Sequence, residues 1–252
     1  MADFFYRLGR LAGPAVRKGR WIWHTLVGTE GDEIAAELAV GRDLAAAMEA
    51  ELGTDRDEAL AAYVSEIGKG LVERVRDQRR SFRFGIVQGR DPNAFALPGG
   101  FVYVTRPLLD LCGQDRDEIA FVLGHEMGHV IRKHAINRVI QSSAIGLVAK
   151  AAPAAGGALA AWVRRSGVRL LESAYSRADE HDADSLGVRL ARAAGHDPDA
   201  SIQLLQRLHA AHEGPEPPPW LSTHPPVRER VARIRETLRE SRADESSDPK
   251  AT

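Results

Sequence analysis

Five consecutive residues carry the clearest chemistry in this sequence: His125-Glu126-Met127-Gly128-His129. Residues four apart on a helix share a face, so both imidazoles can bind one Zn2+ ion. The carboxylate of Glu126 follows the first ligand directly and can act as a general base on a zinc-bound water. The segment predicts the first half of a zinc hydrolase site. The alternative is a pair of buried histidines held by hydrogen bonds.

A buried helix is predicted to carry this motif. Residues 115–118, Asp-Arg-Asp-Glu, have the form of an N-terminal capping box. Apolar residues then recur at helical spacing, namely Ile119, Val122, Leu123, Val130 and Ile131. We expect this helix to run from residue 115 to about residue 140 and to hold both histidines inside the fold.

A catalytic zinc ion needs a third protein ligand and one open position. The metzincin spacing is excluded, because it requires Gly and His where this chain has Arg132 and Ala135. His134 lies five residues after His129, off the ligand face, and is expected at the surface or behind the ligands.

The acidic segment at residues 176–184 offers a third ligand. Glu180 and Asp184 lie one turn apart on a helix predicted from about residue 167 to residue 194, where Gly195 ends it. Glu180 can bind the metal, while Asp184 can accept the second N–H of a ligating imidazole and fix its tautomer. A solvated charged face is the alternative, and the nearby histidine motif favours the ligand interpretation.

Four segments together resemble the M48 metallopeptidases, whose branches include HtpX-like, BepA-like and Oma1-like enzymes. They are residues 93–104, 124–130, 176–184 and 222–226, and their order and spacing match the family. The resemblance implies a zincin-type (gluzincin) catalytic domain with one Zn2+ per chain, bound by His125, His129 and Glu180. It also implies that Glu126 is the general base and acid and that Asp184 supports a ligand.

The resemblance assigns a further role to His224, which precedes Pro225-Pro226. In the family, this histidine lies near the metal. There it either occupies the fourth position at rest or stabilises the oxyanion during turnover. A loop histidine ahead of a proline turn is the alternative.

Short alternating strands around Pro98-Gly99-Gly100 predict a hairpin or meander before the metal helix. A strand edge of this kind can bind an extended peptide through backbone hydrogen bonds, with little demand on its sequence. Asn93 and Ala94 are the predicted substrate contacts. The alternative is that the segment is only the turn of a small sheet.

The predicted elements give a mostly helical α+β fold with a small β-sheet or hairpin preceding the metal helix. Further helices are expected at about 30–52 and 55–79, after Pro107, after Pro198, and near the C-terminus to about 240. The 252 residues, 44% of them hydrophobic, suffice for one catalytic domain, assigned to residues 29–240. Residues 1–28 form a basic and apolar segment, and residues 241–252 a tail predicted to be disordered.

Cytoplasmic localisation is expected from missing signals. Basic residues interrupt the apolar character of residues 1–23, so no secretory signal peptide is predicted. Residues 1–24 suit either packing on the domain or peripheral membrane contact. Residues 144–163 are almost long enough to span a bilayer, but Lys150 and Pro153 interrupt the apolar stretch. We therefore prefer a lid or an apolar loop to a transmembrane helix, and peripheral membrane contact through this stretch remains an alternative.

The single cysteine, Cys112, excludes an intrachain disulfide and a cysteine-based zinc site.

The expected function is zinc-dependent cleavage of unfolded or membrane-associated polypeptides in protein quality control. One alternative is a zinc-containing chaperone or holding protein with little turnover, which would have no physical need for Glu126. Another is a zinc hydrolase acting on something other than peptides, which the strand edge disfavours. The net charge of −1 gives no reason to expect a nucleic-acid partner.

Overall fold

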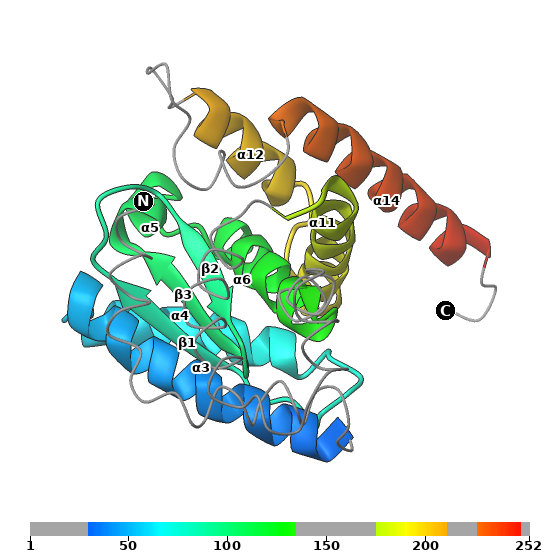
Figure 1. Ribbon diagram of the computed structural model, residues 1–252. Coiled ribbons are helices and arrows are strands. Elements are labelled where there is room, and N and C mark those ends of the chain that lie inside the picture. The colour runs from blue at the N-terminus through cyan, green and yellow to red at the C-terminus, as the bar shows by residue number, and fades with distance from the viewer. Residues whose placement is uncertain (1–29, 135–174, 211–225, 248–252) are drawn as a thin grey trace.

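The computed structural model describes residues 30–134, 175–210 and 226–247, which form the expected mostly helical α+β arrangement (Figure 1). The sheet has three strands in the order β1-β3-β2. They are β1 (Arg83–Val87), β2 (Ala94–Leu97) and β3 (Phe101–Thr105). β3 pairs antiparallel with β2 and parallel with β1. The predicted hairpin is therefore β2–β3, and β1 joins it as a parallel neighbour, so the strands do not form a meander.

Helices cover both faces of this sheet (Figure 1). The long helix α3 (Glu30–Leu52) lies across one face. On the other face lie α4 (Glu58–Val72) and α6 (Arg116–Ile131), which also contact each other. The short helix α5 (Arg106–Leu111) follows β3, as the sequence predicted.

Three further helices complete the described fold, and two of them pack against α6. α11 (Arg177–Ala193) lies along α6, and α12 (Ala200–Ala210) contacts both α6 and α14 (Val227–Ser247). α14 continues past its expected end near residue 240. Its last turns contain Arg, Ala and Glu, which are good helix formers, so polarity alone was a poor guide to disorder.

Some predicted segments lie outside the described residues. These are residues 1–28, the apolar stretch 144–163, the proline-rich loop up to residue 225 and the last residues of the chain, 248–252. Among the helices described, none is long and apolar enough to cross a membrane.

The motif helix α6 is buried on almost every side, and not only along one apolar stripe. All residues from Glu118 to Val130 are buried, because the sheet, α4, α11 and α12 pack around them. The side chain of Asp115 caps the helix by accepting the N–H groups of Asp117 and Glu118 at 2.9 and 3.0 Å. The carboxylate of Glu118 binds Arg207 of α12 at 2.7 and 3.1 Å, so the predicted reciprocal capping box is not made.

The ends of α6 and α11 differ from the predicted boundaries for local reasons. α6 ends at Ile131 and does not continue to about residue 140, because Lys133 has a left-handed backbone with φ of 57°. α11 begins at Arg177, well after residue 167. Ser176 and Asp179 form a capping box there, with each side chain bonded to the other's backbone N–H.

The helix α4 is shorter at both ends than the predicted residues 55–79. Asp57 caps its first turn, and the N–H of Asp55 bonds the carbonyl of Ile86, so the residues before α4 join the edge of the sheet. At the other end, the side-chain amide of Gln78 donates to the carbonyl of Val72. Contacts to the sheet and to turns thus replace the helical ladder at both ends.

The β2–β3 turn depends on its two glycines. Gly99 and Gly100 have φ values of 77° and 83°, a region that favours glycine. A Cβ on Gly99 would lie only 2.6 Å from the Cα of Leu38 in α3. The turn therefore packs backbone to backbone against α3.

Glycines also allow α6 and α11 to approach closely. A Cβ on Gly187 would lie 2.7 Å from the backbone nitrogen of His125, and a Cβ on Gly124 would lie 2.9 Å from the carbonyl oxygen of Gly187. One turn later, a Cβ on Gly128 would lie 3.0 Å from the Cα of Ala183. The two helices therefore touch through their backbones, which places α11 directly beside the histidine motif.

We expect Gly187→Ala to lower the free energy of unfolding by about 1–3 kcal/mol, because the added methyl group collides with the backbone of α6. Zinc affinity should fall as well, since separating the helices moves the α11 side chains away from the histidines. Gly70→Ala is the matched control: it also lies in a helix, nothing lies within 4 Å of its Cβ, and it should stabilise by about 1 kcal/mol. Chemical denaturation and zinc titration of both variants test this, and similar effects would contradict it.

Candidate metal centre

His125 and His129 of α6 and Glu180 of α11 bring their side chains together in the interior. The two Nε2 atoms are 3.2 Å apart. The carboxylate oxygens of Glu180 lie 3.7 Å from Nε2 of His125 and 3.5 Å from Nε2 of His129. All three residues are buried, and their ligand atoms lie within 4.8 Å of one another.

These separations fit a bound zinc ion. Bonds of about 2.0–2.1 Å in a tetrahedral arrangement place neighbouring ligand atoms about 3.3 Å apart. The distances of 3.2, 3.5 and 3.7 Å between the three side chains are close to that value. Two imidazoles and one carboxylate are also a donor set of catalytic zinc, which leaves a fourth position open.

Asp184 and Arg230 lie behind His125. Asp184 can only accept when ionised, so the His125 Nδ1–H donates to its Oδ1 at 2.8 Å and leaves Nε2 to face the cluster. Arg230 comes from α14, is fully buried, and donates to both oxygens of Asp184 at 2.6 and 2.9 Å. Asp184 thus lies beside His125. Arg230 was missed, because α14 contains several arginines and the pattern marks none of them as buried.

The charges of this group follow from its surroundings. Burial alone would raise the pKa of Asp184, but Arg230 and the hydrogen bond from His125 outweigh burial and hold that pKa well below its ordinary value. Burial lowers the pKa of His125, so the imidazole stays neutral and can bind a metal. Burial raises the pKa of Glu180 to about 7, although His125 and Arg230 oppose the shift.

His129 is held by a different pair of residues. Its Nδ1 lies 3.0 Å from Nδ1 of His134, and the ring of Tyr175 stacks on it with centroids 3.9 Å apart. His134 is itself buried, with Nε2 3.6 Å from Asp179 and 3.7 Å from Asp182. His134 therefore lies behind a ligand and not at the surface. Tyr175 was missed because a single aromatic outside any motif gives no signal.

β2 is one of the two edge strands of the sheet. The N–H of Thr105 donates to the carbonyl of Asn93, and the N–H of Asn93 donates to Oγ1 of Thr105, both at 2.9 Å. The backbone of Asn93 is therefore directed toward β3. Backbone groups alternate sides along an antiparallel strand, so those of Ala94 and Ala96 point outward, where no strand of the described chain pairs with them.

Of the two predicted catalytic residues, Glu126 and His224, the structure describes only Glu126. Glu126 follows the ligand His125 in α6 and is 3% exposed. His224 lies outside the described residues.

Comparison with known sequences agrees with this site. Residues 58–238 match the profile described as Peptidase family M48. The chain belongs to this family. The M48 resemblance inferred from four short segments is therefore confirmed.

Individual M48 relatives match most of this chain. It is 31% identical over 192 residues to the mitochondrial metalloendopeptidase OMA1 of Schizosaccharomyces pombe, covering 74% of this chain and 56% of the relative. It is 29% identical over 198 residues to the beta-barrel assembly-enhancing protease of Escherichia coli K12, covering 74% of this chain and 40% of the relative. Metalloprotease LoiP of the same strain is 27% identical over 182 residues, covering 71% and 70%. The chain thus spans about half, or less, of the first two relatives.

Arg230→Met should weaken zinc binding by about 10- to 100-fold, because Asp184 then no longer orients His125 firmly. It should also lower the free energy of unfolding by about 3–5 kcal/mol, since a buried carboxylate loses its cation. Arg233→Met is the matched control on the same helix, where an exposed pair with Glu236 should contribute about 0.5 kcal/mol or less. Zinc titration and denaturation measure both effects. Unchanged zinc affinity in folded Arg230→Met protein would contradict the positioning role.

Zinc binding should release a proton from Glu180 at low pH. The pKa of this carboxyl in the metal-free protein is about 7, and only its ionised form binds zinc, so affinity should fall by up to tenfold per pH unit below 7. In the metal-free protein, a raised pKa favours the folded state at low pH, and this stabilisation is lost as pH rises from about 4.5 to 7. Calorimetry in buffers of different ionisation enthalpy should show about one proton released at pH 6, where the free carboxyl is mostly protonated. Zinc binding without proton release at pH 6 would contradict the assignment.

Proposed function

We propose that this chain is a zinc-dependent endopeptidase that cleaves unfolded or membrane-associated polypeptides, with a role in protein quality control. The observation that carries the proposal is the buried cluster of His125, His129 and Glu180 beside Glu126. M48 membership supports the peptidase class. The names of two relatives, a metalloendopeptidase and a beta-barrel assembly-enhancing protease, support proteins as substrates.

We propose that substrates bind as an added strand along β2. The outward backbone groups of Ala94 and Ala96 can pair with any extended peptide, so binding needs little sequence information. Such a mode suits unfolded chains, whose backbones are accessible. Asn93 would contribute through its side-chain amide, because its backbone is bonded to Thr105.

Each residue of the site then has a chemical task. Zinc at this cluster supplies a Lewis acid that polarises a carbonyl and lowers the pKa of a water. Glu126 takes the proton of the attacking water and later delivers it to the leaving amine. Asp184 holds the tautomer and orientation of His125. For His224 we propose one of two roles, a fourth ligand at rest or a donor to the oxyanion.

Domain limits and location are also proposals. The M48 match to residues 58–238 supports a catalytic unit within residues 29–240, preceded by the segment 1–28. We propose a cytoplasmic protein with peripheral membrane contact through residues 1–24 or 144–163.

Glu126→Gln should abolish cleavage of an unfolded protein such as casein, with a loss of about 10²- to 10⁴-fold, because an amide cannot accept the proton. Zinc content should stay at one ion per chain, since the ligands are unchanged. Glu66→Gln, at an exposed glutamate of α4, is the control and should keep full activity. Cleavage assays with zinc quantification test this.

Full activity of Glu126→Gln would overturn the assigned mechanism. Stoichiometric zinc without any cleavage by the wild-type protein would favour the alternative of a zinc-containing holding protein, which the open edge of β2 would also serve.

A further inference from the structure

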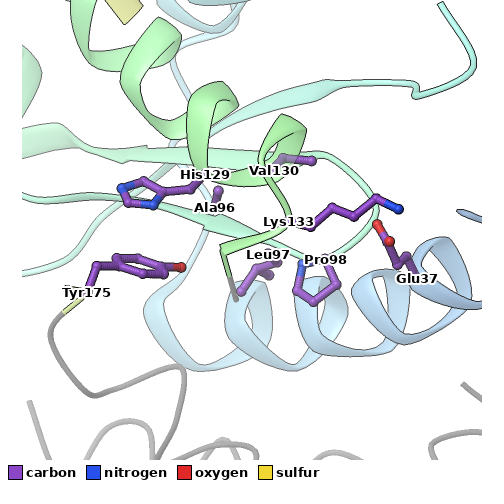
Figure 2. A pocket seen from close by; sticks show the side chains of 8 residues that line it. All are labelled: Glu37, Ala96, Leu97, Pro98, His129, Val130, Lys133 and Tyr175. Atoms are coloured by element: carbon purple, nitrogen blue, oxygen red, sulfur yellow. The ribbon is translucent and has the colours of Figure 1, made fainter. Parts of the chain in front are cut away.

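An apolar pocket lies directly beside the metal centre (Figure 2). Its walls come from β2, from the turn that follows it and from the end of α6, namely Ala96, Leu97, Pro98 and Val130. The metal ligand His129 lies at one end and Lys133 at the other (Figure 2). None of the proposed catalytic steps uses this space.

The pocket lies to one side of the catalytic residues, toward the C-terminal ends of α6 and β2. It contains the second histidine ligand, His129, but neither His125 nor Ala94. The later residues of both α6 and β2 line it, Val130 and Leu97 among them. It therefore lies toward the C-terminal ends of both elements, adjacent to the place where Glu126 would act.

A peptide added to β2 would pass over this pocket. Pairing with the outward backbone groups of Ala96 brings the peptide to the pocket wall that Ala96 itself forms. Antiparallel pairing is slightly more stable than parallel pairing. In that orientation the peptide runs from Pro98 toward Ala94, so the residue above the pocket precedes the scissile bond.

The chemistry of the pocket selects an apolar side chain. Four of its eight lining residues are apolar and, with the ring of Tyr175, present mainly carbon surface, which is stabilised when it covers a hydrocarbon group. At the far end, Lys133 and Glu37 carry opposite charges, and Arg80 binds the Glu37 carboxylate through both of its oxygens. Neither a cationic nor an anionic substrate side chain is therefore favoured there.

We propose that this pocket is a specificity site for a leucine, methionine or phenylalanine side chain on the N-terminal side of the scissile bond. The inference rests on the proposed peptidase function and names the substrate feature that the site selects. Val130 and Ala96 set the size of the pocket, so opposite volume changes at these two positions should shift the preference in opposite directions.

The test measures cleavage of a peptide mixture of mixed sequence by the zinc-loaded full chain, with products sequenced by mass spectrometry. Wild-type protein should enrich Leu, Met or Phe about tenfold over Ala or Asp at one position before the scissile bond. Ala96→Val should shift this preference toward smaller residues, and Val130→Ala toward Phe and Trp. Val75→Ala, at a valine with the same 8% exposure but away from the pocket, should leave the preference unchanged.

A binding measurement separates this proposal from the proposed function. The same mixture is passed over immobilised, zinc-loaded Glu126→Gln protein, alone and combined with each pocket substitution, and the retained peptides are sequenced. Opposite shifts in retention support the pocket even if the wild-type protein cleaves nothing, which would overturn only the peptidase function. Cleavage whose preference is not apolar, or does not move in either variant, overturns the pocket alone. Absence of both cleavage and selective retention overturns both.

Discussion

The backbone contact between α6 and α11 is the constraint on which the rest of the structure depends. Gly124 and Gly187 leave no room for side chains between the helices, so α11 lies close enough for Glu180 to reach both histidines. The geometry of the metal site is therefore set by steric contact between two backbones, and the ligand side chains need only adopt suitable rotamers. A rigid frame of this kind keeps the ligands at separations that fit zinc without reorganisation when the metal binds.

Dense packing has an electrostatic consequence, because it removes several ionisable groups from water. Asp184 is buried and kept ionised by Arg230, which links the first ligand to α14. Glu118 at the start of α6 is likewise held by Arg207 of α12. The pair of Glu118 and Arg207 joins α12 to α6, and the buried pair of Asp184 and Arg230, which is costly to break, joins α14 to α11. The helix α14 supplies no metal ligand among the described residues, yet through Asp184 it helps to orient His125.

The sheet supplies the open strand edge along which we propose that substrates bind. β2 is at the edge of a three-stranded sheet, with outward backbone groups on Ala94 and Ala96 and the metal-bearing helix beside it. The close turn at Gly99 and Gly100 holds this edge against α3, so the strand that would receive a peptide is itself fixed. The helix that carries the histidines and the strand edge that we propose for peptide binding are therefore in contact, with the apolar pocket between them.

By itself, the sequence determined the features that depend on local backbone geometry. The four-residue spacing placed His125 with His129, and Glu180 with Asp184, and the Pro-Gly-Gly turn predicted the hairpin. Several helix ends were predicted wrongly, because caps and a left-handed residue, and not periodicity, decide where a helix stops. Only the tertiary structure decided the parallel pairing of β1, the burial of Arg230 and the pocket beside the metal site. These features arise where segments far apart in the chain meet, and spacing along the sequence carries no information about such meetings.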